Sequence, residues 1–161
     1  AGPIRAAGGT AEAFSVIIAD YVRIKMGYAP FDPTEKEVKR TAIEIRDYHD
    51  RVTNLQYVPS EEEIIFLVEN IPIEIKGDPT EDFEVSNYKD LERIETNRIR
   101  GGVCLVVAEG MAQKAKKINK QLQNWGAEFG LEWGFLTEFL EIQKKTKAKG
   151  EDTENKSKNH T

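Results

Sequence analysis

The sequence predicts an α+β fold that is mainly helical, with about five helices, a small two-stranded β element and a disordered C-terminal tail. Two observations support the helices. Apolar residues recur at three- and four-residue steps over most of the 161 residues. Two capping boxes, Thr34 with Glu37 and Ser60 with Glu63, mark helix starts. The β element rests on residues 72–76, which alternate apolar and charged side chains as a half-buried strand does.

The first expected helix covers residues 11–26, with Thr10 as its N-cap and Gly27 as its C′ residue. Prolines in the segment that follows cannot continue a helix. The second helix begins after Thr34, and its inward face consists of Val38, Ala42, Ile45 and Tyr48 or His49.

A third helix is expected after Ser60, ending near Asn70. Beyond it, residues 72–76 and residues 82–85 both alternate apolar and polar side chains, and a Gly-Asp-Pro-Thr turn separates them. We expect these two stretches to form a hairpin or a pair of short edge strands.

The second half of the chain is expected to form two further helices. One begins near Gly101 and runs to about Asn124, and the other covers residues 131–147. The end of the chain is charged and carries almost no apolar side chains, so it cannot stabilise a packed structure. The sequence therefore predicts one helical domain over residues 1–148 and a disordered polar tail over residues 149–161.

Composition excludes several classes of protein. No apolar run approaches the roughly 20 residues of a membrane-spanning helix. A single cysteine and two histidines exclude an internal disulfide and a structural zinc site in this segment, and they predict a reducing, intracellular compartment. The first residue is Ala1 rather than methionine, and no signal peptide follows it, so we expect a segment of a longer chain.

Charge is distributed unevenly along a chain whose formal net charge is −5. Residues 61–95 hold twelve acids against three bases, a net charge of −9, whereas residues 144–161 hold six lysines against three acids. Nucleic-acid-binding modules usually present a basic face, so the overall charge opposes a stand-alone DNA-binding role. The acidic stretch is interpreted as a solvated surface.

Two places share the order arginine, paired glycines, helix start. Free N–H groups at a helix N-terminus attract anions, glycine permits close approach, and arginine binds phosphate through two hydrogen bonds. A third polar cluster, at residues 51–54, could join them. The candidate phosphate-binding residues are Arg5, Gly8, Gly9, Thr10, Arg51, Asn54, Arg98, Arg100, Gly101 and Gly102. The alternative interpretation is structural: paired glycines allow close helix packing, and arginines brace loops.

No other group of residues predicts catalysis or metal binding. His49 lies on the inner side of a helix, and Cys104 falls in an apolar turn where an inert buried thiol is expected. Trp125 and Trp133 are interpreted as core or interface anchors. Because no nucleophile, base and orienting group can be assembled, this segment alone is predicted to be inactive.

Several ordered motifs resemble the N-terminal part of the large, catalytic subunit of archaeal family D DNA polymerase. The first is AGPIRAAGGTAEA at residues 1–13. The others lie at residues 48–57, 59–63, 70–77, 84–86, 95–102, 108–110 and 113–115. The resemblance extends to about Gln143.

The resemblance implies a part of a replicative, DNA-directed DNA polymerase of the archaeal cytoplasm, associated with the nucleoid. In that family the large subunit carries out nucleotidyl transfer with Mg²⁺ and holds zinc modules in later domains. A small partner subunit carries the 3′–5′ exonuclease. The implied partners are that subunit, DNA and the remaining domains of the large subunit. This segment would be a non-catalytic scaffold, holding no metal, in which some arginines contact the DNA backbone.

Two alternatives stay open at this point. The segment could be a phosphate-binding module in its own right, which the arginine–diglycine elements favour and the net charge opposes. It could instead be an assembly domain that presents a helix face to a partner subunit.

Overall fold

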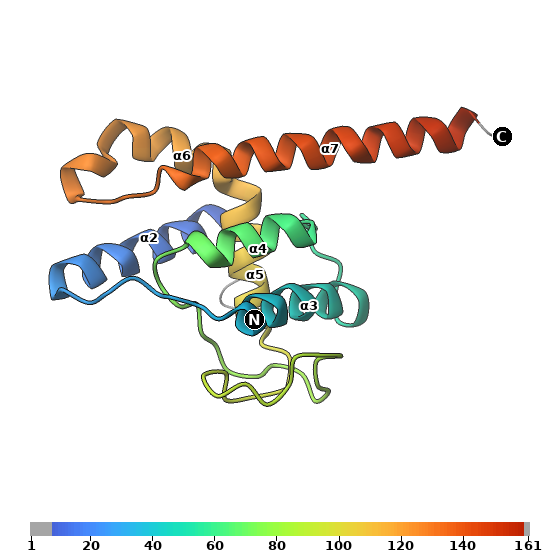
Figure 1. Ribbon diagram of the computed structural model, residues 1–161, viewed down its shortest axis with the longest axis horizontal. Coiled ribbons are helices and arrows are strands. Elements are labelled where there is room, and N and C mark those ends of the chain that lie inside the picture. The colour runs from blue at the N-terminus through green and yellow to red at the C-terminus, as the bar shows by residue number, and fades with distance from the viewer. Residues whose placement is uncertain (1–7, 160–161) are drawn as a thin grey trace.

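The computed structural model describes the backbone of residues 8–159 and the side chains of residues 8–150. Within this part of the chain the structure is mainly helical (Figure 1). Its helices are α2 (Gly9–Met26), α3 (Glu35–Arg51), α4 (Glu61–Asn70), α5 (Gly101–Leu105), the π-helical segment η1 (Val106–Ala112), α6 (Gln113–Trp125), the 3₁₀ turn η2 (Gly126–Phe129) and α7 (Phe135–Asn159).

Three of these elements, α5, η1 and α6, follow one another without a break and form one rod through the molecule. The rod joins the loop-rich end, where residues 71–100 lie, to α7 at the other end (Figure 1). Helices α2 and α4 pack against η1, and α3 packs against α5. Because the rod is covered on several sides, its residues Leu105, Met111 and Ile118 are completely buried.

The described residues confirm the expected set of about five helices, counting the rod as one. Both capping boxes are present: the side chains of Thr34 and Ser60 each accept a hydrogen bond from the backbone N–H of a glutamate three residues on. The prediction for Thr10 was wrong, because the helix begins at Gly9 and its N-cap is Gly8. Gly27 ends the helix in a left-handed conformation, as expected.

The predicted hairpin of residues 72–76 with residues 82–85 is not present among the described residues. The chain instead folds residues 80–85 against residues 97–99, with a single antiparallel bridge between Glu84 and Arg98. Residues 72–76 lie elsewhere, since Ile73 and Ile75 pack against the apolar core. Alternation identified the extended segments but could not identify their partners, which follow from the tertiary fold.

Helix α7 corresponds to the final helix expected over residues 131–147. Its backbone continues to Asn159, through most of the segment 149–161 whose composition predicts disorder. That disorder stays a prediction. None of the helices described here combines the length and apolarity needed to cross a membrane.

Two glycines allow α2 to cross the rod at close range. A Cβ atom at Gly9 would lie 2.4 Å from the carbonyl oxygen of Glu109, and one at Gly110 would lie 3.1 Å from the Cβ of Glu12. The π-helical turn interrupts regular hydrogen bonding at this crossing. Nearby, the side chain of Gln143 on α7 donates to the carbonyl of Ala112 at 2.8 Å. The crossing supports the structural interpretation of the first glycine pair.

Candidate nucleic-acid interface

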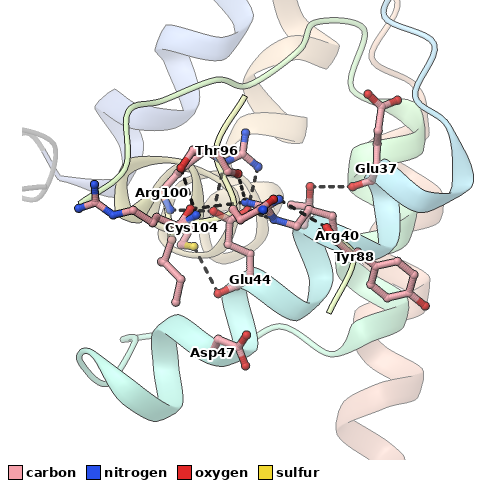
Figure 2. A network of polar contacts seen from close by, with 12 residues as sticks. Glu37, Arg40, Glu44, Asp47, Tyr88, Thr96, Arg100 and Cys104 are labelled. Atoms are coloured by element: carbon pink, nitrogen blue, oxygen red, sulfur yellow. Dashed lines mark hydrogen bonds and ion pairs between the residues drawn. The ribbon is translucent and has the colours of Figure 1, made fainter. Parts of the chain in front are cut away.

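Helix α3 carries a buried stripe of charged side chains that faces the loop-rich end of the molecule (Figure 2). The stripe consists of Glu37, Arg40, Glu44 and Asp47. Spacings of three, four and three residues place these side chains on one helix face. Burial of charge is costly without partners, and each of the four has partners from residues 86–100.

The centre of the stripe is a carboxylate between two guanidinium groups. Glu44 accepts hydrogen bonds from Nε and Nη2 of Arg100 at 3.1 and 2.8 Å, and from the backbone N–H of Arg100 at 2.7 Å. On the other side, Nε of Arg40 lies 3.3 Å from the same carboxylate, an ion-pair contact without hydrogen-bond geometry. Burial lowers the pKa of Arg40, and the charge of Glu44 opposes that shift.

The side chain of Arg40 also donates hydrogen bonds to backbone carbonyls of the loop. Its Nη2 donates to the carbonyl of Thr96 at 2.7 Å and to that of Arg98 at 3.4 Å, and its Nη1 donates to the carbonyl of Tyr88 at 3.5 Å. The side chain of Arg40 is completely buried. Its charge is therefore directed at loop carbonyls rather than at solvent.

The two ends of the stripe bind the same loop region. Glu37 forms an ion pair with Arg93, whose Nε donates to it at 2.9 Å. The hydrogen bond from Arg93 lowers the pKa of Glu37 against the opposing effect of burial. At the other end, Asp47 accepts a hydrogen bond from the backbone N–H of Ser86 at 2.8 Å. The α3 stripe therefore holds the loop at four successive points.

The contacts between the α3 stripe and residues 86–100 are called the brace below. The second arginine–diglycine element is part of it. The guanidinium of Arg100 is buried against Glu44, and Gly101 is buried with its N–H donating to the side chain of Thr80 at 2.9 Å. A Cβ at Gly101 would lie 2.7 Å from that oxygen. Arg98 is partly exposed, and its Nε donates to the carbonyl of Glu81 at 2.6 Å. Gly102 is half-buried in the first turn of α5.

The first arginine–diglycine element lies where α2 crosses η1. Gly8 is exposed and has a φ of 82°, while Gly9 and Thr10 are half-buried at the start of the helix. Arg5 lies outside the described residues. Gly9 packs on Glu109, eight residues beyond Gly101 on the rod. At 1.5 Å per residue this separates the two elements by roughly 12 Å along the rod.

The third cluster is exposed. Arg51 is the last residue of α3, Asn54 lies just beyond the helix, and both are exposed. The guanidinium of Arg51 stacks on the ring of Phe83 at 3.9 Å from its centroid. The structure thus joins Arg98, Arg100 and Gly101 to the α3 stripe, and it leaves Arg51 and Asn54 with open access to solvent.

Sequence reasoning missed Arg40 and Glu44, the two most buried members of the polar brace. It assigned α3 a single inward face of apolar residues. That face is correct, since Val38, Ala42 and Ile45 are buried. A usable signal was present, because a helix that carries charges at steps of three and four residues beside an apolar face has a second stripe that requires partners.

The histidine, cysteine and tryptophan discussed from the sequence are held by hydrogen bonds or buried within the fold. The Nδ1 atom of His49 accepts a hydrogen bond from the backbone N–H of Leu55 at 3.0 Å. Cys104 is completely buried, and burial raises the pKa of its thiol. The indole N–H of Trp133 donates to buried Asp20 at 2.8 Å. Within the described residues, His, Cys, Asp and Glu side chains form no group of three that could hold a metal ion.

Comparison with known proteins identifies the family to which this chain belongs. Residues 1–142 match the family described as DNA polymerase II large subunit DP2, N-terminal. The chain belongs to this family.

Individual relatives agree with the family. The DNA polymerase II large subunit of Nanoarchaeum equitans strain Kin4-M is 63% identical over 150 residues, which cover 92% of this chain and 12% of the relative. That of Pyrococcus abyssi strain GE5 / Orsay is 51% identical over 149 residues, 92% of this chain and 10% of the relative. That of Methanococcoides burtonii strain DSM 6242 is 50% identical over 158 residues, 98% of this chain and 13% of the relative. The chain thus spans only about a tenth to an eighth of these proteins.

Proposed function

We propose that this chain is a non-catalytic scaffold domain of an archaeal family D DNA polymerase. The complete enzyme would carry out template-directed nucleotidyl transfer, with a 3′–5′ exonuclease in its small subunit. Support comes from the family match and from relatives that bear the name DNA polymerase II large subunit. Mg²⁺ and Zn²⁺ belong to the rest of the large subunit in this proposal, because the resemblance to family D DNA polymerase implies them there.

The observation that carries the scaffold role is the direction of the buried arginines. Arg40 and Arg100 are both turned inward and share one carboxylate, Glu44, so their charge is used within the domain. A phosphate could reach Arg100 only if that pair opened, and breaking a buried ion pair is costly. We therefore assign Arg100 and Gly101 to bracing the fold.

Contact with the DNA backbone is proposed for the candidates that do not belong to this brace. Arg51 and Asn54 are exposed and lie three residues apart, so they could reach a phosphate without rearrangement of the core. Gly8, Gly9 and Thr10 at the start of α2 and the sequence-predicted Arg5 stay in the proposal. Arg98, whose side chain is half-exposed, would both brace the fold and contact the DNA backbone.

A surface for assembly is present on α2. Ile18, Val22 and Met26 recur every four residues, and their exposed fractions are 61%, 47% and 60%. An exposed apolar stripe of this kind typically marks an interface. We propose that the rest of the large subunit covers it, because about seven-eighths or more of each relative's length lies outside this region.

The assembly role is tested by cysteine labelling of the full-length large subunit. Val22→Cys should react slowly with a maleimide, as read by peptide mass spectrometry. Lys36→Cys, on the exposed side of α3, should react quickly. Fast labelling at both positions would contradict the scaffold role. Protection that appears only after the small subunit is added would assign the α2 stripe to that subunit instead.

A further inference from the structure

We propose that the exposed side of α6 is a contact surface for the sugar-phosphate backbone of DNA, with Lys116, Lys117 and Lys120 as its charged residues. This inference rests on the proposed function as a polymerase domain. None of the three residues belongs to the arginine–diglycine elements. The surface is defined by these lysines together with Gln123 and Asn124, and is called the α6 lysine face below.

The composition of the rod around α6 is unlike that of the rest of the chain. Residues 110–127 contain four lysines and no aspartate or glutamate, whereas the whole chain has 28 acids among 161 residues. At that average, a stretch of 18 residues would hold about three acids. Two exposed amides, Gln123 and Asn124, follow the last lysine, and amides can hydrogen-bond to phosphate and sugar oxygens without adding negative charge.

Packing of α6 turns these lysines outward. The helix buries Ala115, Ile118, Asn119 and Leu122 against its neighbours. The α6 lysine face occupies the opposite side, and all five of its residues are exposed. From Lys116 to Asn124 the helix rises about 12 Å. That length matches three to four phosphates of one DNA strand, at about 3.4 Å per phosphate.

The three lysines form no ion pair among the described residues, whereas several lysines elsewhere are paired with a nearby acid. Lys39 pairs with Glu35 at 2.8 Å, Lys89 with Glu84 at 3.0 Å, and Lys144 with Glu141 at 3.6 Å. Among the described residues, no side-chain hydrogen bond or ion pair involves Lys116, Lys117 or Lys120. Unpaired surface lysines retain their charge for a polyanion, whose binding is strengthened by release of counterions.

The arrangement of charge in the molecule favours DNA at this end. The acidic loops within residues 61–95 and α6 lie at opposite ends of the rod (Figure 1). A polyanion would be repelled from the acidic loop end, which leaves the α6 lysine face as the more favourable of the two ends.

The experiment measures binding of a labelled primer–template duplex to the full-length large subunit over a salt series. The test variant is K116Q/K117Q/K120Q. The matched control is K36Q/K76Q/K89Q, which removes the same charge from exposed lysines on α3 and in the acidic loops. Each lost phosphate contact reduces the slope of log affinity against log salt by about 0.9. We expect the slope to fall by about 2 to 3 for the test variant and affinity at low salt to fall about tenfold, with the control unchanged.

Equal slopes for the test variant and the wild type would overturn the proposal. So would a weaker association with the small subunit at an unchanged DNA slope, because the α6 lysine face would then bind an acidic protein surface. Circular dichroism and the unfolding midpoint of both variants establish that the domain is folded. The maleimide result at position 22 is independent of these lysines, so the inference can fail while the scaffold role stands.

Discussion

Glu44 on α3 accepts three hydrogen bonds from Arg100, two from its guanidinium and one from its backbone N–H, across 56 residues of sequence. The contact fixes the start of the rod against α3. It also satisfies both carboxylate oxygens of a completely buried side chain. The second arginine–diglycine element is thus held by the fold, and the loop before it is ordered by the same stripe of charges.

The first prediction concerns this contact. Glu44→Ala should destabilise the chain by about 3 to 5 kcal/mol, because it leaves the guanidinium groups of Arg40 and Arg100 buried without a counter-charge. Chemical denaturation measures the change. Glu35→Ala, which removes the exposed partner of Lys39 on the same helix, should change the unfolding free energy far less, because solvent screens an exposed ion pair. Similar losses for the two variants would mean that Glu44 does not brace the fold.

The second prediction separates true helix caps from an apparent one. Thr34→Ala and Ser60→Ala should each lower the unfolding free energy by about 1 kcal/mol, because each removes the acceptor of a capping box. Thr10 lies inside α2, so Thr10→Ala should be close to neutral. Thermal unfolding of the three variants tests this order, and a loss at Thr10 equal to the other two would contradict the position of the helix start.

The third prediction concerns the crossing of α2 and η1. Gly9→Ala should destabilise the chain by about 1 to 3 kcal/mol, since the added methyl group would lie 2.4 Å from the carbonyl oxygen of Glu109. Gly134→Ala is the matched control, because no atom lies within 4 Å of a Cβ at that position. Equal unfolding free energies for the two variants would contradict the close approach of α2 to η1.

The fourth prediction concerns pH. The pKa of Glu37 is lowered from its ordinary value of 4.5, chiefly by the hydrogen bond from Arg93. A carboxyl group with a lowered folded-state pKa stabilises the protein above the unfolded-state pKa, and this stabilisation is lost as pH falls through the folded-state value. The difference in unfolding free energy between wild type and Arg93→Gln should therefore be constant above about pH 5 and shrink below pH 4.5.

Urea titrations at pH 7, 5, 4 and 3 would measure that difference. Arg46→Gln, on the exposed side of the same helix, serves as the control and should show no such convergence with wild type. A difference between wild type and Arg93→Gln that does not change with pH would show that the ion pair with Glu37 contributes no stability.

Local patterns were sufficient to predict the helices. A capping box needs only two side chains at a fixed spacing, so Thr34 and Ser60 could be recognised without knowledge of the fold. The bridge between Glu84 and Arg98 could not be predicted in this way, because it depends on how α3 holds the intervening loop. The pairing of segments is a tertiary property, whereas alternation is a local one.

The candidate site was predicted in part for the same reason. Glycine and arginine spacing identified positions that leave no room for a side chain, and Gly9 and Gly101 are such positions. Spacing alone could not show that Arg100 pairs with Glu44, since the partner lies on another helix. The α6 lysine face has no local motif either, because its lysines share one exposed side only once the helix has formed and buried its other side.

The most direct test of the account is the single-turnover rate of nucleotide incorporation by the assembled polymerase at saturating DNA and nucleotide. The variants are K116Q/K117Q/K120Q and Arg98→Gln, neither of which touches the buried core of the brace. The account predicts rates within about twofold of wild type once DNA is saturating, because a scaffold and backbone-contacting domain affects binding rather than the chemical step. A rate at least tenfold lower under saturation would show that this domain takes part in catalysis.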